Sequence, residues 1–453
     1  MSRLVERGIA RTLVSMAVPM LAGTFALNAY NLADTWYVAR LGTEPLAAMS
    51  FTFPVVMFLG FFVRGIGTGA MTVVAHSLGA HRKEDAATVA THGSLLCVVA
   101  GAVLAVAGWF SIRPVFTRLG ASGEILLMAE QYMRIWYVGM VFRALQVTFN
   151  DVVIGTGHTK ASSSLMVLGT VLNFVLDPVM IFGLFGFPRM GIRGAALATV
   201  ISEGIVMVSG FVLLKRRYGL LSFARPSLAG ILASWGRILR IGAPSILSWV
   251  LNPVASGVVT RMVAGFGVAA VAAFGVAGRI EMFAFMIPMT VGMSLLPFMA
   301  QNYGAGRMDR VRTAYKGAIG FALGYGLAIA AAFTAAAPLL AGFFSKDPAV
   351  TAILVRYIRI TCFGYGMLEV HRYATFSMTG IHKPLVSTAL NTLRLIVLLV
   401  PLSLLGRNVA GLTGMFWARL ATDLLAGGLG IVVVLWGFGR ATPLAAPAAG
   451  TSG

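Results

Sequence analysis

The chain has 453 residues, of which 58% are hydrophobic and only 11% are charged. A water-soluble domain carries roughly 25% charged residues, so this composition excludes an ordinary soluble globular protein. The net charge of +20 would suit a nucleic-acid partner, but the basic residues lie between apolar segments, where membrane proteins carry their topology signals. We therefore expect a protein whose main partner is the lipid bilayer, and no nucleic-acid partner.

Apolar segments follow one another along nearly the whole chain, and each is long enough to cross a hydrocarbon core of about 30 Å. Because every backbone polar group needs a partner in lipid, and the alternation typical of barrel strands is missing, these segments predict α-helices. The expected fold class is an all-α polytopic membrane protein with twelve transmembrane helices. They cover approximately residues 12–38, 46–76, 87–112, 126–154, 161–186, 192–214, 236–263, 269–300, 313–342, 350–378, 384–406 and 411–438.

Lysine and arginine are distributed unequally between the two sets of connecting segments. With the N-terminus inside, 18 lie in cytoplasmic segments, for example Arg82 and Arg307, against 7 in the opposite loops, for example Arg118 and Arg189. This bias predicts that both termini are cytoplasmic. The first apolar run is too long for a cleavable signal peptide, and we expect a multi-pass protein of the cell inner membrane.

The first half of the chain aligns with the second at a shift of 225 residues. The matched positions include Pro19 with Pro244, Gly67 with Gly292, Tyr132 with Tyr357 and, after a small gap, Gly191 with Gly411. A parallel repeat in a very apolar chain is typical of transporters with two lobes and a pathway between them. We expect an N-lobe at 1–214, a cytoplasmic linker at 215–235, a C-lobe at 236–439 and a disordered tail at 440–453, with six helices in each lobe.

The two halves differ at polar positions that lie inside apolar segments. The first half has carboxylates or an amide where the second has hydrocarbon: Asp34 against Val259, Asp177 against Val400 or Leu402, and Asn173 against Ile396 or Leu398. A carboxylate inside a membrane costs several kcal/mol and suggests a function.

Helix geometry indicates that these residues converge. At 1.5 Å per residue, Asp34 is expected about 9 Å, Asp177 about 13 Å and Thr199 about 9 Å from the outer ends of their helices, with Asn173 one turn from Asp177. Such a cluster suits a hard cation, or two carboxylates that share a proton. The alternative is that Asp34 is a buried polar residue satisfied by a neighbour and Asp177 a companion of Pro178.

Other polar residues within apolar segments give weaker indications. Glu281 can pair with Arg279, and Glu369 can form a second polar site with His371 and Arg372. Pro19 removes a hydrogen bond inside the first helix and can kink it. The sequence contains no metal-ligand spacing, P-loop or nucleophile elbow, so we expect neither an enzyme nor a cofactor.

Several stretches around these residues resemble the multidrug and toxic compound extrusion (MATE) family. They are Asn31 to Gly42, Asn173 to Pro178, Gly194 to Thr199 and Gln301 to Ala305. The resemblance implies two six-helix bundles around a central cavity and antiport of cationic, often aromatic, drugs against inward Na⁺ or H⁺. It implies a cation site at Asp34, Asn173, Asp177 and Thr199 and a kink at Pro19. Tyr30, Tyr132 and Asn150 resemble polar lining of the same lobe, and Glu281 and Glu369 are weaker cavity candidates.

One stretch departs from part of the family. The NorM branch uses an acid in the seventh helix, whereas this chain has Ser248-Trp-Val-Leu-Asn252-Pro253 and resembles the DinF-like branch more closely. The coupling ion therefore stays open between H⁺ and Na⁺. The alternatives are a lipid-linked precursor or polysaccharide flippase of the same superfamily and a polytopic membrane enzyme. We expect a monomer that binds small organic cations.

Overall fold

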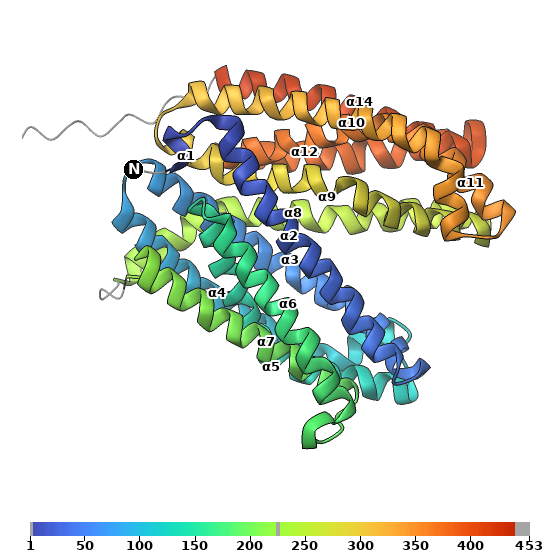
Figure 1. The fold of residues 1–453 in the computed structure, drawn as a ribbon, viewed down its shortest axis with the longest axis horizontal. Helices are drawn as coiled ribbons and strands as arrows, with labels where there is room; N and C mark the ends of the chain where they lie inside the picture. The colour runs from blue at the N-terminus through green and yellow to red at the C-terminus, as the bar shows by residue number, and fades with distance from the viewer. Residues whose placement is uncertain (1–2, 223–226, 440–453) are drawn as a thin grey trace, which may run out of the picture. The chain divides into compact units, whose positions relative to one another are not determined.

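The computed structural model describes residues 3–222 and 227–439, and these are helical almost throughout (Figure 1). The tail predicted at 440–453 lies outside the described residues. In the first half the helices are α1 (Arg3–Glu6), α2 (Ile9–Ala39), α3 (Thr43–Gly79), α4 (Lys83–Arg118), α5 (Gly123–Gly155), α6 (Thr159–Phe182) and α7 (Ile192–Val212). A short 3₁₀ turn, η1 (Leu184–Gly186), follows α6, and a π-helical segment, η2 (Leu213–Tyr218), continues α7.

The second half repeats this order with more breaks. Its helices are α8 (Leu228–Ala264), α9 (Val268–Gly304), α10 (Met308–Phe344), α11 (Pro348–Thr361), α12 (Tyr365–Gly380), α13 (Pro384–Thr392) and α14 (Val400–Gly439). A 3₁₀ turn, η3 (Cys362–Gly364), joins α11 to α12, and a π-helical segment, η4 (Leu393–Leu399), joins α13 to α14.

The described residues account for twelve membrane crossings. Ten helices are long and apolar enough to span a membrane, and the last of them runs over 56 residues from Pro384 to Gly439. At 1.5 Å per residue that segment is about 84 Å long, which is too long for one span. Its backbone leaves the helical conformation at Ala410 and Gly411, so it contains two spans. The segment α11–η3–α12 supplies the remaining one, and the prediction of twelve is confirmed.

The repeat is visible in the backbone. Gly42 and Gly267 precede α3 and α9 with φ of 127° and 99°. Gly191 and Gly411 precede the last span of each half with nearly the same angles, φ 56° and ψ −133° against φ 58° and ψ −139°. Side chains rarely adopt these positive φ values, so glycine recurs where both halves need the same turn.

The chain folds into two compact units, and their boundaries fall inside two helices. Unit 2 runs from Val18 to Ile246, and unit 1 combines the chain up to Ala17 with the chain from Leu247 onward. The boundaries lie beside Pro19 in α2 and Pro244 in α8, the matched prolines of the repeat. Each unit therefore holds the first turns of one long helix that continues in the other unit. Within unit 1, α10, α12 and α14 lie side by side (Figure 1).

Apolar contacts and a few polar ones hold these first turns. Leu4, Leu13 and Met16 are buried in the core of unit 1, where Asn302 Nδ2 donates to the Leu4 carbonyl at 3.2 Å. In unit 2, the Arg237 guanidinium of α8 binds both carboxylate oxygens of Asp85 at 2.7 and 2.9 Å.

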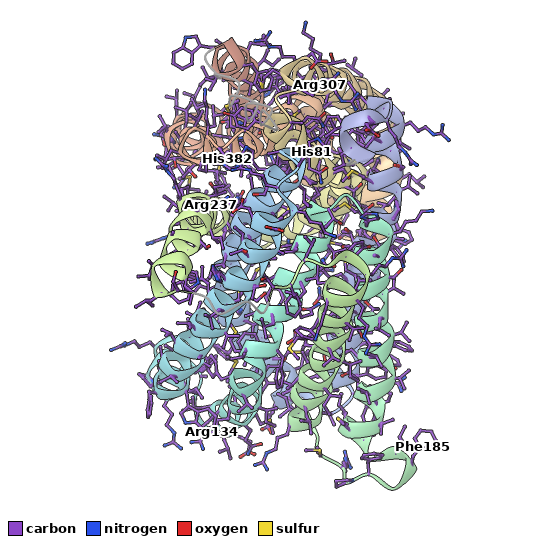
Figure 2. All side chains as sticks on the ribbon, turned by 90° about the vertical axis from the view of Figure 1, so that its left-hand side faces the viewer. His81, Arg134, Phe185, Arg237, Arg307 and His382 are labelled. Carbon is purple, nitrogen blue, oxygen red and sulfur yellow. The ribbon has the colours of Figure 1, made fainter. Side chains whose placement is uncertain are left out.

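The loops of unit 2 alternate between its two ends. Figure 2 shows His81 and Arg237 toward one end of this unit and Arg134 and Phe185 toward the other. Large apolar side chains on the helices stay exposed, for example Phe110 at 79%. Contiguous apolar surface of this kind is stable in contact with lipid rather than water.

Candidate functional site

The strongest site candidates lie at similar depths in three helices of unit 2. Asp34 is five residues before the end of α2, Asp177 five before the end of α6, and Thr199 seven after the start of α7. These positions correspond to depths of about 8, 8 and 10 Å. Asp177 is closer to the helix end than the sequence suggested, because α6 stops at Phe182, where Gly183 adopts a left-handed conformation with φ 75°.

Thr199 connects the other two helices. Its hydroxyl lies 3.3 Å from the Tyr30 hydroxyl of α2 and accepts a hydrogen bond of 3.3 Å from Asn173 Nδ2 of α6. Gly194 makes this approach possible, because a Cβ there would lie 2.5 Å from the Met180 carbonyl oxygen. The absence of a side chain lets α7 pack directly on the backbone of α6.

The two carboxylates are buried, and three of their four oxygens accept no hydrogen bond within the described residues. Asp34 is 5% exposed and Asp177 is fully buried, and they are close enough to interact electrostatically. Within the described residues, Asp34 Oδ1, both Asp177 oxygens and Asn173 Oδ1 accept no hydrogen bond. A buried carboxylate without a partner is strongly unfavourable. A proton or a cation bound among these oxygens would remove that cost.

The geometry is compatible with either ion. Among the described residues, no group of three or more His, Cys, Asp or Glu side chains could hold a metal ion. The two carboxylates, the Asn173 amide oxygen and the Thr199 hydroxyl are the hard oxygen donors that Na⁺ prefers. Two neighbouring carboxylates can equally share a proton.

An ion pair beside this site was not anticipated from the sequence. Arg143 of α5 pairs with Glu203 of α7. Glu203 is four residues after Thr199, so the two share a helix face, and this spacing was the available signal. Of the two weaker lining candidates in α5, Tyr132 is buried, whereas Asn150 is half-buried and accepts a hydrogen bond from Ser162.

In unit 1 the buried acids Glu281, Glu369 and Asp423 each pair with an arginine, although Glu369 Oε2 and Asp423 Oδ2 accept no hydrogen bond within the described residues. Glu281 accepts hydrogen bonds from Tyr357 at 2.7 Å, Tyr365 at 3.0 Å and Arg419 at 2.9 Å. Its ion-pair partner among the described residues is thus Arg419, not the neighbouring Arg279 that the sequence suggested. Glu281 is therefore held in place rather than open to a ligand.

Two further ion pairs lie in the same unit. Glu369 pairs with Arg372 at 2.7 Å, as the sequence suggested, and His371 contacts the Asn391 amide oxygen at 3.2 Å. Arg394 binds Asp423 Oδ1 through Nε at 3.1 Å and Nη2 at 2.7 Å. Neither member of this second pair was a candidate from the sequence.

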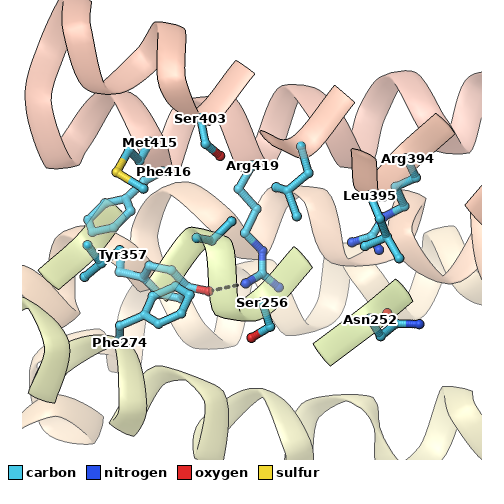
Figure 3. A pocket seen from close by; sticks show the side chains of 13 residues that line it. Asn252, Ser256, Phe274, Tyr357, Arg394, Leu395, Ser403, Met415, Phe416 and Arg419 are labelled. Carbon is cyan, nitrogen blue, oxygen red and sulfur yellow. Dashed lines mark hydrogen bonds between the residues drawn. The ribbon is translucent and has the colours of Figure 1, made fainter. Parts of the chain in front are cut away.

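A cavity of about 170 Å³ opens beside Arg394 and Arg419 (Figure 3). It is lined by Asn252, Ser256, Val259, Val263, Phe274, Tyr357, Arg394, Leu395, Leu399, Ser403, Met415, Phe416 and Arg419. Two guanidinium groups, several hydroxyls and an amide thus share the wall with aromatic and aliphatic side chains. Such a mixed surface suits an organic ligand.

A helical membrane protein built from a parallel repeat, with unpaired buried carboxylates in one half, has the architecture of a secondary transporter. The MatE family model matches residues 19–179 and again 244–405. The two matches begin at Pro19 and Pro244, the first matched pair of the repeat. The chain belongs to the MATE family, whose members are transporters.

Three relatives illustrate this membership. An FAD transporter of Shewanella oneidensis is 34% identical over 94% of both chains. The multidrug export protein MepA of Staphylococcus haemolyticus is 24% identical over 95% of this chain and 94% of its own. The MATE transporter VcmN of Vibrio cholerae, solved in its bent form, superposes with a TM-score of 0.90 at 28% identity and covers 95% of this chain and 97% of its own.

Proposed function

We propose that the protein is a secondary active efflux transporter that exchanges an organic compound for an inward-moving H⁺ or Na⁺. The observation that carries the proposal is the group of buried oxygens of Asp34, Asn173 and Asp177 without hydrogen-bond donors. A site that is costly when empty and relieved by a cation gives the ion gradient a place to act. The ion can shift the transporter between states only by its difference in affinity for them.

The site residues are Asp34, Asn173, Asp177 and Thr199, with Tyr30 as the neighbour of Thr199. Occupation of the site by an ion neutralises the carboxylates that attract a cationic substrate, so binding of the ion and of the substrate oppose each other. Pro19 lies 15 residues before Asp34 in the same helix, and bending there would let α2 repack when the site is neutral. The first substrate class is therefore cationic, aromatic organic compounds.

Flavin nucleotides are the second substrate candidate. The relative with 34% identity over 94% of both chains is an FAD transporter, and the Arg394 and Arg419 side chains line a cavity in unit 1. An export assay in inside-out vesicles with FAD and with a cationic dye separates the two candidates. Preferential uptake of FAD would support the nucleotide, and uptake of the dye alone would exclude it.

The remaining features of the proposal follow from the sequence. We place the protein in the cell inner membrane with both termini cytoplasmic, as a monomer without a cofactor and without enzymatic activity. We also place it nearer the DinF-like branch, because Asn252 lies in the α8 stretch where the NorM branch carries an acid. A flippase for lipid-linked precursors is less well supported, because such transporters tend to have more helices than the twelve crossings described above.

The coupling site is tested by transport under separately imposed H⁺ and Na⁺ gradients, without nucleotide. Asp34→Asn and Asp177→Asn should each reduce gradient-driven uptake into inside-out vesicles to the level measured without a gradient. Asp309→Asn, a change at an exposed carboxylate paired with Arg307, is the control and should transport normally. Wild-type activity in both site variants would favour the alternative of structurally buried acids.

A further inference from the structure

The cavity in unit 1 occupies the position that the repeat assigns to the counterpart of the Asp34 site. Three of its lining residues match residues of the first half: two of these belong to the Asp34 site, and the third is the lining candidate Tyr132. The offset before the last span is set by Gly191 and Gly411. The pairs are Asp34 with Val259, Tyr132 with Tyr357, and Thr199 with Arg419. Matched positions of the repeat thus contribute to an acidic site in the first half and to a site with the opposite charge in the second.

The charge presented to the cavity is positive. Its lining includes Arg394 and Arg419 but no aspartate or glutamate. The acids that balance these arginines, Asp423 and Glu281, do not line the cavity but pair with the guanidinium groups from elsewhere in the fold. A ligand in the cavity meets the two cations first.

Both guanidinium groups keep hydrogen-bond donors for a ligand. A guanidinium has five N–H donors. The described contacts of Arg394 use its Nε and Nη2 on Asp423. Those of Arg419 use Nη1 on Tyr357 and Nη2 on Glu281, while its Nε is 3.9 Å from Asp423. Such a fork suits the oxygens of a phosphate or carboxylate.

The rest of the wall suits an aromatic group. One side of the cavity is lined by Phe274, Phe416 and Met415. The side where Figure 3 shows the Arg419 guanidinium and Leu395 also holds Asn252 and Ser256, which are one helical turn apart on α8. A volume of about 170 Å³ is below the roughly 300 Å³ of a pocket that encloses a whole drug-sized ligand. The cavity therefore accommodates one end of a ligand.

We propose that this cavity is an anion subsite, in which Arg394 and Arg419 bind the phosphate or carboxylate of an aromatic substrate. The proposal rests on the proposed transport function and extends it. It also means that the transporter accepts aromatic anions, not only cations.

The test compares flavins with the same ring system whose side chains carry different charged groups. Riboflavin, carboxymethylflavin and flavin mononucleotide share one ring system and carry no charge, a carboxylate and a phosphate, respectively. Quenching of flavin fluorescence by the purified full-length protein gives their dissociation constants without any gradient. The wild-type protein should bind at least one of the two anions about tenfold more tightly than riboflavin. The order of the two anions distinguishes a phosphate from a carboxylate.

The variants remove an arginine together with its own acid, so that no buried charge is left unpaired. The two double variants are Arg394→Gln with Asp423→Asn and Arg419→Gln with Glu281→Gln. In each of them, the affinity for the anionic flavins should fall to about the affinity for riboflavin. Arg372→Gln with Glu369→Gln neutralises a similar pair that does not line the cavity, and it should keep the wild-type preference. A thermal melt of each variant checks that it is folded.

The proposal is overturned if the wild-type protein shows no preference for either anion, which includes binding none of the probes. It is also overturned if the preference survives in both cavity variants or is lost equally in the Arg372 control. A failure of the transport function is a different result. In that case the wild-type protein prefers the anionic flavins and the cavity variants lose this preference, but neither an H⁺ nor a Na⁺ gradient drives substrate uptake into vesicles.

Discussion

At the scale of single residues, the surroundings of each acid decide its role. Asp34 and Glu281 are both acids inside apolar helices, but they meet different neighbours. Oδ1 of Asp34 accepts no hydrogen bond within the described residues, whereas Glu281 receives three. The first arrangement is stabilised by a bound ion, and the second already has its countercharge. We therefore expect the Asp34 site to respond to ions, whereas Glu281 fixes the position of Arg419.

Glu281→Gln should lower stability more than it lowers ion coupling. The change removes the ion-pair partner of the Arg419 guanidinium at Glu281, and the Arg419 side chain is only 20% exposed. The lost charged hydrogen bond costs about 1–3 kcal/mol of stability. Thermal unfolding in detergent measures this loss, and the double variant with Arg419→Gln should recover part of it. A variant of unchanged stability that fails to couple transport to the gradient would instead make Glu281 an ion site.

At the scale of helices, close backbone contact and helix-internal proline determine how the site is assembled. Gly194 brings α7 onto α6, so that Thr199 of one meets Asn173 of the other. Pro19 interrupts the hydrogen bonds of α2 next to the boundary between Ala17 and Val18, where the helix passes from one unit to the other. One feature fixes the geometry of the site, and the other gives its first helix a place to bend.

Gly194→Ala should impair coupling by separating α7 from α6. The new Cβ would lie 2.5 Å from a backbone oxygen that has no freedom to move away, so the helices must shift, at a cost of about 1–3 kcal/mol. The affinity for the coupling ion should fall together with the rate of transport. Gly204→Ala, on the same helix with its nearest contact at 3.8 Å, is the control and should behave as wild type. Equal behaviour of the two variants would exclude this explanation.

Pro19→Ala should slow transport more than it weakens substrate binding. Alanine restores the hydrogen bond that proline cannot donate and stiffens the helix. A hundredfold difference in ion affinity between two states supplies only about 2.7 kcal/mol. Because bending a stiffer helix costs more free energy, less of this driving force is left for transport. Binding and vesicle uptake are measured side by side, with Pro114→Ala in α4 as the control. Normal uptake by Pro19→Ala would favour rigid movement of the lobes.

At the scale of the whole molecule, the parallel repeat sets the topology. Twelve crossings return the chain to the side from which it started, which agrees with the unequal distribution of basic residues between the loops. The described part of the chain gives exposed positions at both ends, Glu6 and Gly439, and in loops or helix ends between them. These positions allow the topology to be tested directly.

Single cysteines at Glu6, Glu84 and Gly439 should react with an impermeant thiol reagent from the cytoplasmic side, and one at Phe185 from the opposite side. The native Cys97 and Cys362 are buried and are replaced by serine first. Labelling is compared between intact cells and inside-out vesicles. Reaction of Glu6→Cys and Gly439→Cys from opposite sides would contradict a chain with an even number of crossings.

The sequence by itself determined the class of fold, the number of spans, the repeat and the four residues of the proposed ion site. Hydrophobic length, the recurrence of Pro19 at Pro244 and the depth of Asp34 and Thr199 are local properties, and helix geometry converts them directly into positions. The partners of the charged side chains could not be predicted from the sequence in the same way. Arg394 and Asp423 are 29 residues apart, and Arg419 reaches Glu281 across 138. Only the packing of helices that are distant in sequence decided which charges are paired and which face a cavity.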